Sequence, residues 1–92
     1  MQVFSLVEEV LHTPPLPFDP ERQTLKGWIT YCLRDRGFKV VSVANADLAV
    51  EMRTGEKVPF GITETTENLD RQMAWFVRDR ATNQVTLLPP QG

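Results

Sequence analysis

The chain has 92 residues and a formal net charge of −2, with 41% hydrophobic and 24% charged residues. This length predicts one small domain, 1–92, with a thin core that an oligomer would help to stabilise. The charge balance lacks the basic excess of a dedicated nucleic-acid-binding protein, and a single cysteine, Cys32, excludes an internal disulfide. With His12 as the one histidine, a zinc site is not expected.

The first 18 residues predict a helix and then a proline-rich connector. Apolar residues at positions 3, 6, 7, 10 and 11 have helical spacing, which predicts a helix over 1–12. Three prolines follow within 14–17 and favour an extended path. We expect this connector to lay Leu16 and Phe18 on the domain, and the alternative is a polyproline ligand for a protein partner.

The core, 19–88, opens with a second predicted helix over about 20–36. Asp19 is suited to cap its first amides, and Pro20 suits its first position. Gly37 tolerates the positive φ that ends many helices. One apolar stripe runs along this helix and consists of Leu25, Trp28, Ile29, Cys32 and Leu33. Because Cys32 lies on the stripe, we interpret it as a small core residue rather than a nucleophile.

The middle of the chain predicts three consecutive strands, over 38–43, 47–52 and 57–63. Apolar and polar residues alternate along the second and third strands, and Gly55 lies in the hairpin turn between them. This pairing places Glu51 near Lys57, and it places Asp47 near Gly61 and Thr63.

The remaining residues predict another helix, a last short strand and a frayed tail. Thr65 or Thr66 is suited to cap a helix over about 65–81, and the strand follows at 85–88, before the tail at 89–92. The whole order is α-β-β-β-α-β after an extra N-terminal helix. We therefore predict an α/β (α+β) sandwich with a mixed sheet of about four strands.

This order and two short motifs resemble the core of the restriction-endonuclease-like superfamily, the PD-(D/E)xK nuclease fold. The helix end at 31–37 followed by Phe38-Lys39-Val40-Val41 is similar to the family's Gly-aromatic-x-Val-Val sequence at the start of the first strand. Residues 47–52, followed by a glycine turn, resemble the strand that holds the family's metal-binding aspartate. The resemblance spans about residues 22–88.

The resemblance implies a Mg²⁺ site made of an aspartate on one strand and a glutamate and lysine on the next. Asp47 matches the aspartate, but Gly61 and Thr63 occupy the positions of the other two. Glu64 is one residue off and is expected on the opposite face. The resemblance therefore implies a nuclease-like scaffold without a catalytic site, for which no cofactor is expected.

Each candidate catalytic residue also has a simpler interpretation. Asp47 is suited to shape the turn that starts a strand, and Glu51 and Lys57 form a solvated cross-strand pair. The alternative function is a divergent Mg²⁺-dependent nuclease that uses Asp47, Glu51 and Glu64.

Two sets of residues are candidates for binding. Trp75 lies off the apolar stripe of its predicted helix, and exposed tryptophan is typical of protein interfaces. Four basic residues would form a patch for nucleic acid at one end of the sheet, although the mixed-in acids favour ordinary surface charges: Arg34, Arg36, Lys39 and Arg53.

We therefore predict a non-catalytic module that mediates protein–protein association or self-association as a homodimer. No stretch approaches the roughly 18 apolar residues of a membrane span, so no membrane partner is expected. The N-terminus lacks the pattern of a signal peptide, and we expect a cytoplasmic protein.

Overall fold

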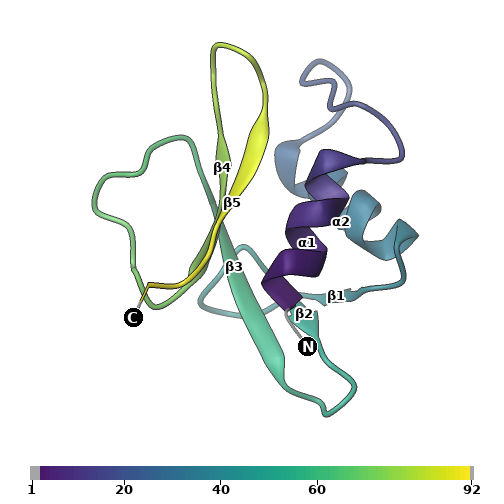
Figure 1. Ribbon diagram of the computed structural model, residues 1–92, viewed down its shortest axis with the longest axis vertical. Helices are drawn as coiled ribbons and strands as arrows, with labels where there is room; N and C mark the ends of the chain where they lie inside the picture. The colour runs from purple at the N-terminus through teal and green to yellow at the C-terminus, as the bar shows by residue number, and fades with distance from the viewer. Residues whose placement is uncertain (1–2, 92) are drawn as a thin grey trace.

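The fold has two layers, a five-stranded sheet and two helices that pack on one of its faces (Figure 1). The structure is a computed structural model that describes residues 3–91, and the predicted ends at 1–2 and 92 lie outside this range. In chain order the elements are α1 (Val3–His12), α2 (Leu25–Asp35), β1 (Lys39–Val41), β2 (Leu48–Glu51), β3 (Lys57–Thr63), β4 (Ala74–Arg78) and β5 (Val85–Leu88).

The strands lie in the sheet in the same order as in the chain. Three neighbouring pairs are antiparallel, and β3 and β4 are parallel. The predicted mixed α+β fold with a mixed sheet is confirmed at this level, with five strands instead of about four.

The helix predicted over 65–81 is wrong. Residues 64–73 form a loop, and the next residues form β4. Local polar groups explain the difference: the Glu67 N–H donates to Thr65 Oγ1 at 3.2 Å, and the Gln72 N–H donates to Asp70 Oδ1 at 2.9 Å. Asn68 adopts a φ of 60°. These turns compete with helical hydrogen bonds. The helix that the predicted α-β-β-β-α-β order places before its last strand is therefore absent from residues 64–78.

Helix α2, predicted over about 20–36, begins later than predicted, at Leu25. Thr24 is the residue that caps α2, and its hydroxyl accepts a hydrogen bond from the Gly27 N–H at 3.0 Å. Asp19 instead starts a separate turn, in which its carbonyl oxygen accepts from the Gln23 N–H at 3.0 Å. Gly37 has a φ of 93° just after α2, which confirms its predicted role.

The hydrophobic core lies between the two helices and one face of the sheet. Phe60 and Phe76 are fully buried there, and their rings stack with centroids 5.1 Å apart. Cys32 is 1% exposed in this core, and burial raises the pKa of its thiol to about 11, with a smaller contribution from Asp35. The prediction that Cys32 is a core residue is confirmed.

The proline-rich connector lies on the core as predicted. Leu16 and Phe18 pack against the buried cluster, and the Leu16 carbonyl accepts a hydrogen bond from Trp28 Nε1 at 3.0 Å. The Phe18 and Trp28 rings lie 5.4 Å apart. Neither helix in residues 3–91 is long and apolar enough to cross a membrane.

The opposite face of the sheet carries neither α1 nor α2. Side chains alternate along each strand, so the neighbours of buried Phe76 on β4, Trp75 and Val77, point away from the helices. The loop 64–73, which joins the two parallel strands, lies on the far side of β3 and β4 from the helices (Figure 1). We call this surface the open face.

Candidate functional site

Asp47, which the family resemblance matches to a metal-binding aspartate, binds the backbone of the neighbouring strand. Its Oδ2 accepts a hydrogen bond from the Ile62 N–H at 2.7 Å, and its own N–H donates to the Phe60 carbonyl at 3.1 Å. These bonds place Asp47 beside Gly61, as predicted. The carboxylate joins the start of β2 to β3.

Glu51 lies opposite a lysine on each neighbouring strand. The register pairs it with Lys39 on β1 and with Lys57 on β3, so the predicted proximity to Lys57 is confirmed. Its ion pair, however, is with Lys39, at 3.0 Å between Oε2 and Nζ. This hydrogen bond is the main reason why the pKa of Glu51 lies below its usual value, and the charges of Lys39 and Lys57 lower it further.

Glu64, the third candidate acid, is bound by two arginines of the β4–β5 hairpin. Its carboxylate lies 2.9 Å from Arg78 Nη1 and 3.4 Å from Arg80 Nε. The structure therefore gives each of the three candidate acids a separate partner. Within residues 3–91, no cluster of three His, Cys, Asp or Glu side chains could hold a metal ion.

Gly61 lies directly beneath the ring of Trp75. The two residues are register partners on parallel β3 and β4, and a Cβ atom added to Gly61 would overlap the benzene ring of the indole. This position, where the family resemblance places a glutamate, therefore has to remain bare. An aromatic ring that covers a glycine on the neighbouring strand is a known way of stabilising a sheet.

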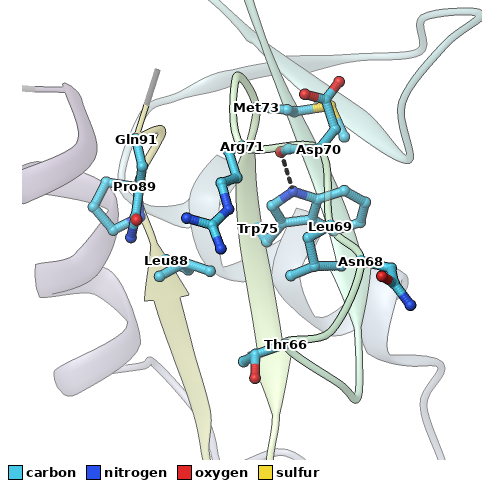
Figure 2. A pocket seen from close by; sticks show the side chains of 10 residues that line it. All are labelled: Thr66, Asn68, Leu69, Asp70, Arg71, Met73, Trp75, Leu88, Pro89 and Gln91. Carbon is cyan, nitrogen blue, oxygen red and sulfur yellow. Dashed lines mark hydrogen bonds between the residues drawn. The ribbon is translucent and has the colours of Figure 1, made fainter.

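The ring of Trp75 forms part of a hollow of about 440 Å³ on the open face (Figure 2). Its Nε1 donates to the Asp70 carbonyl at 2.9 Å, and this hydrogen bond joins the ring to the loop 64–73. The hollow lies between β4, the end of β5, the loop 64–73 and the C-terminal segment, and its lining residues are Thr66, Asn68, Leu69, Asp70, Arg71, Met73, Trp75, Leu88, Pro89 and Gln91. We call it the Trp75 hollow.

The C-terminal segment is attached to the loop at one side of this hollow. The Gln91 N–H donates to the Arg71 carbonyl at 2.7 Å. Figure 2 shows the Arg71 side chain extending between Pro89 and Trp75. The Trp75 hollow thus combines an aromatic wall, aliphatic side chains and a guanidinium.

The four basic residues considered as a patch for nucleic acid are brought together only in part. Arg36, Lys39 and Arg53 line one hollow of about 770 Å³, whereas Arg34 does not line it and donates to the Val40 carbonyl at 3.1 Å. Glu51 and Glu56 lie in the same lining. The patch is therefore mixed in charge.

The sequence indicates Trp75 as a binding residue but does not indicate the residues that hold it. The predictions assign Gly61 to the position of the family's glutamate and Asp70 to a helix. The aromatic and β-branched residues of Ala74–Arg78 are the signal that could have placed Trp75 on a strand instead of a helix.

Comparison of the chain with models of protein families, with curated proteins and with solved structures finds no match. The resemblance to the restriction-endonuclease-like core stays a prediction, and one of the two helices on which it was based is a loop and a strand.

Proposed function

We propose that this chain is a non-catalytic module that associates with protein, either a second copy of itself or another chain, through the open face. The observation that carries the proposal is Trp75, a half-buried aromatic residue on a sheet face that carries neither helix. Tryptophan is enriched among the few residues that dominate the affinity of protein interfaces.

The way in which Trp75 is held supports a binding role. Contact with Gly61 on one side and the hydrogen bond to the Asp70 carbonyl restrict its rotamers before any partner arrives. A side chain that is already ordered loses little entropy on binding, so its contact area contributes more fully to affinity.

The partners of the acidic residues support the absence of catalysis. Asp47 accepts from a backbone amide of β3, while Glu51 and Glu64 are held in separate ion pairs. A Mg²⁺ site needs these oxygens free and converging on one point.

Sedimentation velocity across the micromolar range tests self-association. We expect a dimer that forms with increasing concentration and is lost in Trp75→Ala, whose folding is checked by circular dichroism. Thr86→Arg gives a second variant, because Thr86 is exposed on the same face and its change leaves Trp75 intact. Tyr31→Ala is the matched control, since Tyr31 is an aromatic residue that is 52% exposed on α2.

A monomer at every concentration would remove self-association and leave a different protein as the partner. A photo-crosslinking amino acid at Thr86 tests that case in cells, with the same amino acid at Tyr31 as the control. We expect one defined adduct from Thr86 only, and its loss when Trp75→Ala is added. If neither a dimer nor a Trp75-dependent adduct forms, the proposal is wrong.

The competing function is a divergent Mg²⁺-dependent nuclease that uses Asp47, Glu51 and Glu64. It would require these side chains to leave their present partners and converge. We expect no cleavage of DNA or RNA with Mg²⁺ or Mn²⁺. Cleavage that Asp47→Ala abolishes, while the fold is retained, would favour the nuclease instead.

A further inference from the structure

At the other end of the sheet, the β2–β3 hairpin extends beyond α1 (Figure 1). The hollow of about 770 Å³ described above, which Arg36, Lys39 and Arg53 line, lies beside this hairpin. Its floor is apolar and is formed by four residues from α1, the start of β1 and the end of β2: Leu6, Phe38, Val50 and Met52. We call this surface the hairpin notch. Phe38 and Met52 also pack against the main core, so the floor is an exposed extension of that core.

The floor of the notch includes an exposed leucine. Leu6 is 38% exposed, and it is one of only two large hydrophobic side chains in residues 3–91 that are this exposed. Phe38 and Met52 beside it are half-buried, so the floor offers partly exposed apolar side chains to another molecule.

The rim of the notch carries an excess of positive charge. Lys39 is neutralised by Glu51, but Arg36 and Arg53 have no acidic partner among the described residues. Within residues 3–91, the one hydrogen bond of the Arg36 side chain is to the Thr13 hydroxyl, at 2.7 Å. Two guanidinium groups therefore face one remaining carboxylate, that of Glu56.

We propose that the hairpin notch binds a short amphipathic, acidic helix of a protein partner. The apolar face of such a helix would cover Leu6, Phe38 and Met52, and its carboxylates would pair with Arg36 and Arg53. A helix laid in an apolar groove is a common form of peptide recognition, and guanidinium–carboxylate pairs are among the stronger hydrogen bonds.

The composition of the notch favours a peptide over nucleic acid. Its floor is mainly aliphatic and offers one aromatic ring, Phe38, whereas single-stranded nucleic acid is usually bound by several stacking rings. The notch and the Trp75 hollow share no lining residue, so this proposal does not depend on the function proposed for the open face.

The test uses a designed amphipathic peptide with leucines on one face and glutamates beside them. Its matched control carries glutamine at every glutamate position, with a helix-stabilising staple in both. Fluorescence anisotropy gives the Kd, and amide chemical shifts locate the site on the full chain. We expect saturable binding with shifts centred on Leu6, Phe38 and Arg53, and about tenfold weaker binding of the glutamine peptide.

Protein variants separate the two parts of the site. Arg36→Gln combined with Arg53→Gln should weaken the acidic peptide about tenfold and leave the glutamine peptide nearly unchanged. Leu6→Gln should weaken both peptides. Arg22→Gln is the control, because this arginine is exposed and lies outside the notch lining.

Three results would overturn the proposal: no saturable binding, equal affinity for the two peptides, or shifts that map elsewhere. Tighter binding of single-stranded DNA or RNA at the notch, with a steep salt dependence, would also overturn it and assign the rim to nucleic acid.

Discussion

The two faces of the sheet use the same strands but are covered by different means. On the helix side, Phe60 and Phe76 are fully buried beneath α1 and α2. On the open face, Trp75 and Leu88 are only half-buried, and a loop without regular structure lies over part of them. The largest fully buried side chains therefore lie on the helix side of the sheet, where we expect most of the stability to arise.

The largest loss of stability is expected from a substitution on the helix side of the sheet. Phe76→Ala removes a fully buried ring that stacks on Phe60, and it should lower the free energy of unfolding by about 3–5 kcal/mol. Urea denaturation followed by circular dichroism measures the loss. Val77→Ala, one position along on the open face, is the control, and an equal loss there would contradict the difference between the faces.

Alkaline pH tests the same side through Cys32. Its thiol pKa rises from 9.0 to about 11 in the folded chain, so the unfolded chain ionises first. The protonated Cys32 thiol therefore contributes fully to the free energy of unfolding below pH 9. This contribution, at most about 2–3 kcal/mol, is lost as the pH rises through about 11. Urea denaturation of the wild type and of Cys32→Ala at several pH values isolates this part. An identical pH dependence in the two proteins would show that Cys32 contributes nothing.

A smaller effect is expected on the open face from Gly61→Ala. The new methyl group would displace the Trp75 ring and should cost about 1–3 kcal/mol. In a Trp75→Ala background the same change should cost nothing or stabilise slightly, because alanine restricts the unfolded chain more than glycine does. A double-mutant cycle measures the coupling. Additive effects would mean that the ring does not depend on Gly61 for its position.

The smallest effect concerns the surface charges at the end of the sheet. Lys39→Gln removes the hydrogen bond that lowers the pKa of Glu51, so this pKa should rise toward its ordinary value. Side-chain carboxyl NMR titration follows the shift. Stability should hardly change, since ion pairs this exposed contribute little. An unchanged Glu51 pKa would show that the pair is not populated in solution.

The predictions from the sequence were most accurate where one residue pattern determined both the secondary structure and the pairing of the strands. The alternation along β2 and β3, with Gly55 in the turn, fixed the register that places Glu51 opposite Lys57. The glycine after α2 also ended the helix as predicted. In both cases the local pattern and the packing demand the same conformation.

The prediction failed where spacing coincided with a helix by chance. Leu69, Met73 and Phe76 have helical spacing. However, the side chains of Thr65 and Asp70 accept hydrogen bonds from nearby backbone amides and favour turns. Trp75 was therefore selected from a helix that does not exist, although it does lie on a partly exposed face. The role of Gly61 could not be foreseen, because it depends on which strand becomes its parallel neighbour.

The placement of α1 affects how the chain can fold during its synthesis. The first helix of the described chain packs against β5, the last strand, and buries Val7 and Val10 in the shared core. While the ribosome is still adding the residues of β5, the apolar side of α1 has no completed sheet to cover. The domain therefore reaches its native packing only after the residues of β5 have left the exit tunnel, and until then the part of α1 that packs on β5 stays uncovered.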